Sequence, residues 1–170
     1  MEKQIKLYTY QKNTDLHCLS AFATIKEFLK CESISKCRRF IYWDITADCN
    51  SETELMDKIV SKSYYLLNTN KEDYYINTIP LTTKDNNFHV NVIVNSKISI
   101  KYDSMIEKIN TKCNVKIKQL DRSVLWSLTV TSSSYDDAVN IVSKQLLGAS
   151  NEKHPLLLNP IFETYQLCNS

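Results

Sequence analysis

Two adjacent residues, His17 and Cys18, are of the types that nucleophilic catalysis uses, a base beside a thiol. They stand at the start of a stretch with helical spacing of apolar residues, and neighbouring residues on a helix point about 100° apart. Their side chains therefore do not face one another. We expect an imidazole on the helix surface and a half-buried thiol rather than a catalytic pair.

The other titratable candidates are two histidines and two aspartates. His89 falls in an alternating, strand-like segment and His154 in a predicted loop, and neither has a second ligand at metal spacing. Asp44 and Asp48 could form an acid pair, but one lies within a predicted strand and the other at its end, beside a helix start. We expect solvated side chains here, and hence no catalytic residue, bound cofactor or metal in this chain.

Composition argues against several further kinds of site. The only glycine is Gly148, so no glycine-rich phosphate loop can form. The run "RRFIYWDI" from Arg38 has the basic and aromatic character of an RNA-binding strand, but it lacks the glycine of that motif, and the net charge is only +2. We interpret its rings as core residues and expect no nucleic-acid partner; an RNA-binding tandem is the third alternative.

Cysteine usage and hydropathy indicate the compartment. The six cysteines include no Cys-x-x-Cys pair, and a chain of 170 residues can bury enough surface to fold without disulfides. The start from Met1 to Asp15 is charged, and no run of about 18 apolar residues occurs. We therefore expect free thiols, a cytoplasmic location and no membrane contact.

An internal repeat organises the chain. The tetrad Ile-Val-Ser-Lys occurs at residues 59–62 and again at 141–144, and Trp43 and Trp126 lie 83 positions apart in alternating runs. Each run is followed by a helix start with a hydroxyl cap, Ser51 in one half and Ser134 in the other. The sequence predicts two related units, residues 1–79 and 88–170, joined by a polar linker at 80–87.

Each half is predicted to contain a strand, a helix, a strand pair, a helix and a strand. The apolar stripes of the two first helices are Leu16, Leu19, Phe22, Ala23 and Leu29 in one half and Tyr102, Met105, Ile106, Ile109 and Cys113 in the other. This β-α-β-β-α-β order is the ferredoxin-like α+β plan, an antiparallel sheet with both helices on one face. Because the strand from Phe40 is apolar on both faces, we expect the two sheets to pack together as a pseudo-dimer.

The segment "LLLNPIFETYQL" from Leu156 resembles the closing motif of PurS, the small subunit of phosphoribosylformylglycinamidine (FGAM) synthase. In that family a helix ends in a Leu-Leu-x-Asn-Pro sequence that leads into the last strand. The matching residues are Leu156, Leu157, Asn159, Pro160, Ile161, Glu163 and Tyr165. Upstream, Asp121 and Arg122 take the places of the family's Gly-Lys turn. The first half is more faintly similar, with Arg38 and Arg39 at that turn and Asn68 before a threonine.

The resemblance implies an accessory role in de novo purine biosynthesis. PurS has no chemistry of its own and bridges a PurL-type synthetase subunit, which uses ATP and Mg, and a PurQ-type glutaminase subunit, which releases ammonia. This chain would be a tandem of two PurS-like units within that C–N ligase complex, and it could also pair as a homodimer. Arg39 and Arg122, at the two matching turns, are the partner-binding candidates, and Asn159 and Pro160 are assigned to structure. The alternative is a ligand-sensing regulatory module of the same fold.

Overall fold

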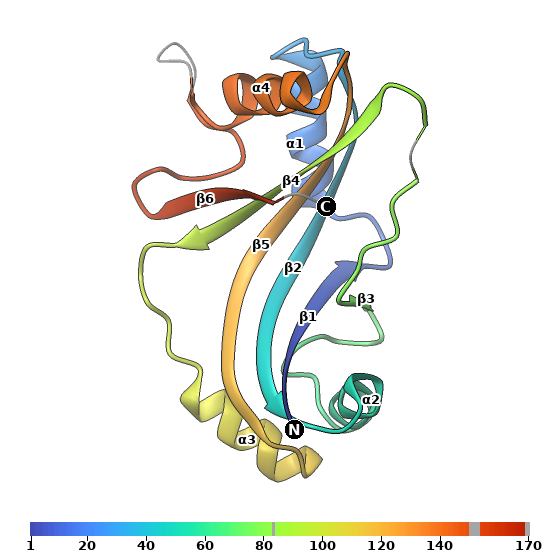
Figure 1. The fold of residues 1–170 in the computed structure, drawn as a ribbon. Coiled ribbons are helices and arrows are strands. Elements are labelled where there is room, and N and C mark those ends of the chain that lie inside the picture. Colours follow the sequence, from blue (N-terminus) through green and yellow to red (C-terminus); the bar gives the residue numbers. More distant parts are fainter. Residues whose placement is uncertain (83, 150–153, 169–170) are drawn as a thin grey trace. The chain divides into compact units, whose positions relative to one another are not determined.

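The computed structural model describes residues 1–82, 84–149 and 154–168 of the chain. Strands and helices follow one another in the order β-α-β-α-β, and this order occurs twice (Figure 1). The elements are β1 (Glu2–Gln11), α1 (Leu16–Glu27), β2 (Ile34–Asp48), α2 (Glu52–Lys62), β3 (Glu72–Ile76), β4 (Asn87–Ser96), α3 (Asp103–Cys113), β5 (Ile117–Thr131), α4 (Tyr135–Leu146) and β6 (Glu163–Cys168). Within the described ranges, no helix is both long and apolar enough to span a bilayer.

The fold is α+β, as predicted, but it has one six-stranded antiparallel sheet with the strand order β3-β1-β2-β5-β4-β6. The expectation of two sheets packed face to face is therefore wrong. In the register of β1 and β2, Leu7 lies opposite Trp43 on one face, and Tyr8 lies opposite Tyr42 on the other. The rings of Tyr8 and Tyr42 stack with centroids 5.3 Å apart, so aromatic residues of the second face cover one another within a single sheet.

The two longest strands, β2 and β5, have 15 residues each. The predicted strand pair with a turn at Arg39 is wrong, and so is the turn at Arg122, because both arginines lie inside these continuous strands. The chain forms two compact units, and β2 and β5 each contribute a segment to both. Unit 1 comprises residues 1–13, 41–79 and 99–123, and unit 2 comprises residues 14–40, 80–98 and 124–170. The predicted repeat boundary at residues 80–87 falls between β3 and β4 and stays a prediction.

In unit 1, helices α2 and α3 cover the face of the sheet that carries Leu7 and Trp43. The apolar stripe predicted for α3 is confirmed, since Ile109 and Cys113 are fully buried against strands of the first half. Ile59 of α2 is buried in the same core. The fully or nearly buried positions of this unit include Ile5, Leu7, Trp43, Ile45, Ala47, Leu55, Met56, Ile59, Ile109, Cys113, Ile117 and Leu120.

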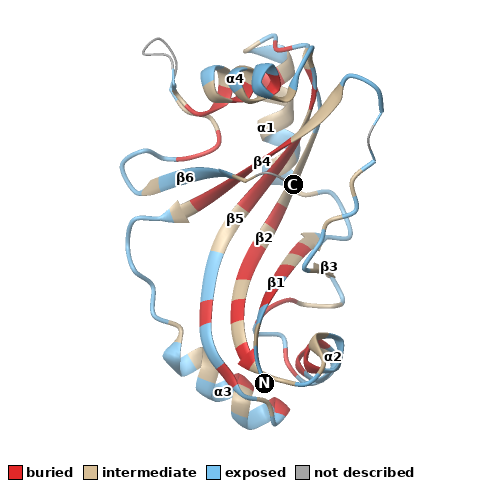
Figure 2. Cartoon of the chain, viewed as in Figure 1, coloured by how far each residue is buried: buried red, intermediate tan, exposed pale blue. Residues whose placement is uncertain are grey.

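In unit 2, helices α1 and α4 pack on β4 and β5, whose buried residues Figure 2 marks in red. The stripe predicted for α1 is wrong at its start: Leu16 is 73% and Leu19 is 55% exposed, whereas Ile25 is fully buried. Leucines at helical spacing define an apolar side, but they do not say whether a sheet covers it. Here the helix turns the side with Cys18, Phe22 and Ile25 to the core instead.

Local signals at the helix ends gave correct predictions. The hydroxyl of Ser51 accepts a hydrogen bond from the backbone N–H of Glu54, and that of Ser134 accepts one from Asp137. Both serines are N-caps, and acidic residues occupy the first turn of both helices, where the helix dipole favours negative charge. The alternating segments that begin near Gln4 and Phe88 form the strands β1 and β4.

The closing motif does not end a helix, contrary to the family pattern. Helix α4 ends at Leu146, and Gly148 has a positive φ of 73°. Leu157 lies in a non-helical segment that is nevertheless buried in the core of unit 2. The backbone N–H of Leu156 donates to the carbonyl oxygen of Leu146 at 2.8 Å, so the motif returns to the helix end and pairs one of its free carbonyls. The predicted loop from Gly148 to Pro155 lies partly outside the described residues.

The packing of α1 predicts opposite outcomes for two substitutions. Ile25→Ala should lower the free energy of unfolding by about 2–5 kcal/mol, because it leaves a cavity in the core. Leu19→Ala should change it by no more than about 0.5 kcal/mol, because its side chain is largely in solvent. Urea unfolding followed by circular dichroism measures both. A larger loss for Leu19→Ala than for Ile25→Ala would mean that the other side of α1 faces the core.

Candidate functional site

Arg39 lies in the middle of β2, in unit 2, and is tied to the start of α1. Its Nη1 donates to Oδ2 of Asp15 at 3.3 Å, and both side chains are only about one-fifth exposed, at 20% and 17%. The other carboxylate oxygen of Asp15 accepts hydrogen bonds from the backbone N–H groups of His17 and Cys18, so Asp15 is the N-cap of α1. A half-buried guanidinium therefore gains a charge-assisted partner from a helix cap.

Each of the two predicted arginines lies over a tryptophan from the other half of the sequence. The Cζ atom of Arg39 is 5.8 Å from the ring centroid of Trp126, within unit 2. The Cζ atom of Arg122 is 5.8 Å from that of Trp43, within unit 1. Such contacts fall within the range in which a cation is attracted to the face of an indole. The matching positions of the two halves thus have matching contacts, although neither arginine lies in a turn.

The surroundings of the two arginines differ. At Trp43 the ring of Tyr102 packs edge-on with centroids 5.6 Å apart, and the indole N–H donates to the carbonyl oxygen of Leu66 at 3.1 Å. Tyr102 is the N-cap residue of α3, the place that Asp15 holds for α1. Among the described residues no carboxylate pairs with Arg122, which is exposed. Arg39 is therefore held mainly inside its unit, whereas the guanidinium of Arg122 is exposed and contacts only the Trp43 ring among the described residues.

A cavity of about 430 Å³ lies beside Arg39 in unit 2. Its walls include Leu16 and Ser20 of α1, Trp126 of β5, Leu157 of the closing motif and Glu163 at the start of β6. The lining is apolar apart from a few hydroxyls and three titratable side chains, Arg39, His17 and Glu163. Such a cavity suits a small carboxylate with an apolar body, or an acidic side chain of a partner protein.

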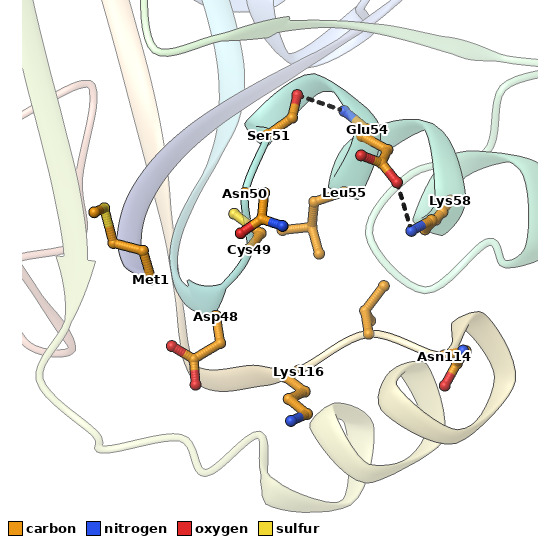
Figure 3. Close-up of a pocket in the computed structure, with 11 residues that line it drawn as sticks. Met1, Asp48, Cys49, Asn50, Ser51, Glu54, Leu55, Lys58, Asn114 and Lys116 are labelled. Atoms are coloured by element: carbon orange, nitrogen blue, oxygen red, sulfur yellow. Dashed lines mark hydrogen bonds and ion pairs between the residues drawn. The ribbon is translucent and has the colours of Figure 1, made fainter.

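A second cavity, of about 470 Å³, lies in unit 1 at the start of α2 (Figure 3). Asp48 and the cap residue Ser51 line it, together with Glu54 and Lys58, which form an ion pair of 2.8 Å. The hydrogen bond from Lys58 lowers the pKa of Glu54, and a hydrogen bond from Lys118 lowers the pKa of Asp48. Both carboxylates therefore stay ionised at neutral pH and are unsuited to act as general acids.

The histidines do not form a site. His17 is exposed, and the thiol of its neighbour Cys18 donates to the carbonyl oxygen of Cys37. The two ring nitrogens of His89 lie within hydrogen-bond distance of the carbonyl oxygen of Thr82 and the hydroxyl of Thr129. His154 is exposed. In the part of the chain that the structure describes, no three His, Cys, Asp or Glu residues cluster closely enough to hold a metal ion.

Asn159 and Pro160 lie in a hydrogen-bonded turn that leads into β6. The side-chain oxygen of Asn159 accepts from the N–H of Ile161, and its own N–H donates to Glu163 at 2.7 Å. The carbonyl oxygen of Pro160 accepts a hydrogen bond from Lys97. These contacts fix the entry to the last strand, although the motif does not end a helix as the family pattern predicts.

The turn before β3 repeats these contacts. The side-chain oxygen of Asn68 accepts from Asn70, and its N–H donates to Glu72 at 2.7 Å. Lys12 donates to the carbonyl oxygen of Thr69, which stands where the other half has proline. The turn therefore forms with or without proline, and the asparagine and the glutamate are the residues that define it.

Two parts of the site were missed by sequence reasoning. Asp15 is of a type preferred at helix N-caps and directly precedes α1, so its cap was open to prediction, but its pairing with Arg39 was not. The contact between Cys18 and Cys37 gave no signal, because the two residues lie on different elements with no recognised spacing.

No protein-family model matches the sequence, and no curated protein matches it either. The resemblance to PurS therefore stays a prediction from the motif residues.

A double-mutant cycle on Arg39 and Asp15 measures their coupling. We expect about 1–2 kcal/mol of coupling between Arg39→Gln and Asp15→Asn in urea unfolding, because both groups are about four-fifths buried and directly hydrogen-bonded. The exposed pair of Glu54 and Lys58 on α2 is the control and should give a clearly smaller coupling, because solvent screens it. Equal coupling for the two pairs would show that the Arg39 pair is as solvated as the surface one.

The ion cluster at Lys118 predicts a pH effect. Its Nζ lies 2.7 Å from Glu2 and 3.1 Å from Asp48, and Lys118→Met should raise the pKa of Asp48 toward its ordinary value. In the wild type the folded pKa is the lower one, so the stabilisation is present above the unfolded pKa and is lost as pH falls through the folded pKa. Carboxyl carbon-13 NMR titration measures the shift. An unchanged pKa in the variant would remove Lys118 as its cause.

Proposed function

We propose that this chain is a non-catalytic accessory subunit of FGAM synthase, built as a tandem of two PurS-like units. The observation that supports this most directly is the turn at Asn159 and Glu163, which stands at the closing motif and recurs with the same hydrogen bonds at Asn68 and Glu72. A single copy of such a turn is common in proteins. Two copies, each directly before the last strand of a half, favour a duplicated unit.

The element order supports a duplicated ferredoxin-like plan in an exchanged form. Unit 1 has strands in the order β3, β1, then segments of β2 and β5, with helices α2 and α3. These are four strands and two helices, the content of one β-α-β-β-α-β unit. Because β2 does not fold back as a hairpin, the first half of the sequence cannot supply all the strands of unit 1. Helix α3 and the first segment of β5, from the second half, complete it. Unit 2 receives α1 and part of β2 in return. We infer a pseudo-dimer with exchanged elements.

This arrangement suits a bridging subunit. A covalent tandem removes the translational cost of bringing two copies together. Two units fixed in one chain present two related surfaces, one for a PurL-type synthetase and one for a PurQ-type glutaminase. ATP and Mg would belong to the synthetase. Holding the two partners together would favour delivery of ammonia before water protonates it. The complex would act in the cytoplasm.

Arg122 is the residue best placed to contact a partner. It is exposed, its guanidinium lies over Trp43, and no carboxylate among the described residues neutralises it. Arginine held over an aromatic ring loses little freedom on binding and is frequent at the energetic centres of interfaces. Arg39 is the second candidate, through the cavity beside it, although its ion pair with Asp15 leaves it less available.

Reconstitution tests the proposal. The chain is mixed with the synthetase and glutaminase subunits from the same cell, and amidine formation is followed with glutamine or with added ammonia. Glutamine-dependent formation should require the chain, and ammonia-dependent formation should depend on it less. Arg122→Gln should lower the glutamine-dependent rate about tenfold. Lys36→Gln, at an exposed position of β2, is the matched control and should have no effect. A chain that neither co-purifies with the subunits nor alters either rate would refute the proposal.

The cavity beside Arg39 favours the alternative, a ligand-sensing module. A guanidinium beside an open pocket with both apolar and polar walls is suited to an amino acid or a similar small carboxylate. Titration of the folded chain with amino acids, read by Trp126 fluorescence and compared with Arg39→Gln, separates the two functions. Saturable binding without any effect of the chain on amidine formation would favour the sensor.

A further inference from the structure

Cys18 of α1 and Cys37 of β2 are in contact, with 18 residues between them in the sequence. The thiol of Cys18 lies 3.2 Å from the carbonyl oxygen of Cys37, to which it donates. Both side chains are half-buried and pack against the core of unit 2. Tertiary packing of a helix on a strand therefore places the Cys18 thiol directly against Cys37, with both side chains at the same core.

The surroundings distinguish the two thiols. The interaction with Cys37 lowers the pKa of Cys18 by more than burial and the charge of Asp15 raise it, and the charge of Arg39 lowers it further. The same interaction, together with burial, raises the pKa of Cys37. Cys18 is thus the better nucleophile, and Cys37 keeps its proton until it reacts.

The other four cysteines lack this arrangement. Cys31 and Cys113 are buried in the cores, and Cys49 and Cys168 are half-buried. Among the hydrogen bonds of the described residues, only the one from the Cys18 thiol to the Cys37 carbonyl oxygen joins two cysteines. Packing alone does not require two cysteines from separate elements to lie in contact.

We propose that Cys18 and Cys37 are a redox modification site that forms a reversible disulfide with hydrogen peroxide. The Cys18 thiolate attacks one peroxide oxygen; an S–O bond forms, the O–O bond breaks, and the leaving hydroxide takes a proton to become water. The Cys37 thiol then loses its proton and attacks the Cys18 sulfur; the S–S bond forms, the S–O bond breaks, and a second water leaves. Two thiols and one peroxide give one disulfide and two waters, and a dithiol reverses the reaction by exchange.

The disulfide would lock the first turn of α1 to β2. The Asp15–Arg39 ion pair joins the same two elements, and α1 forms one wall of the cavity beside Arg39. Oxidation would therefore fix that wall, while reduction would leave it held by non-covalent contacts alone. This inference does not depend on the proposed function, since it concerns only residues of unit 2.

Peroxide treatment of the reduced full-length chain tests the site. We expect the number of reactive thiols to fall from six to four, a mass loss of two hydrogens, and a cross-linked peptide pair containing Cys18 and Cys37. Dithiothreitol should restore all six thiols. The midpoint of thermal unfolding should rise by about 5 °C on oxidation, because the cross-link closes a loop in the unfolded chain.

Three variants complete the experiment. Cys18→Ser and Cys37→Ser should each abolish the mass loss, and Cys49→Ser, at another half-buried thiol, should retain it. Peptide mapping of the wild type needs no variant, so the test survives if a substitution prevents folding. The proposal is overturned if a sulfenic acid accumulates on Cys18 without a cross-link, or if the cross-link joins any other pair.

Discussion

The continuity of β2 and β5 is the constraint on which the rest of the fold depends. Each is a strand of 15 residues that serves both compact units, so neither unit is complete with one half of the sequence. Because a strand that does not turn cannot pair with itself, the complementary half-strand has to come from the other half. The helix next to that half-strand comes with it, which is why α3 is buried against β1 and β2, and α1 joins α4.

Both long strands carry an arginine that contacts residues far away in the sequence. Arg39 donates to Asp15 and lies over Trp126, and Arg122 lies over Trp43. A half-buried guanidinium without such contacts would lose hydration and gain nothing in return. The same contacts that permit the long strands also bring charge, aromatic surface and, in unit 2, a cavity to one place. The chemistry of the candidate site is therefore a consequence of how the strands are stabilised.

The two units differ where their first helices begin. Asp15 as the cap of α1 produces an ion pair, whereas Tyr102 at the same place on α3 produces an aromatic contact with Trp43. The residue at the helix start thus decides whether the arginine has a carboxylate partner or only an aromatic contact. The thiol pair belongs to the same region of unit 2, since Cys18 lies in the first turn of α1 and Cys37 lies two residues before Arg39.

The sequence by itself determined the local structure. Sequence patterns predicted the caps Ser51 and Ser134, the alternating strands and the apolar stripe of α3. These features were predictable because each depends on residues within a few positions of one another. Tertiary structure alone decided that β2 runs through Arg39, that Leu19 faces solvent, that one sheet forms, and that Cys18 meets Cys37. The polar pair Arg38 and Arg39 has the same local sequence pattern inside a strand as it would have in a turn. Only partners far away in the sequence, here Asp15 and Trp126, make the extended form the stable one.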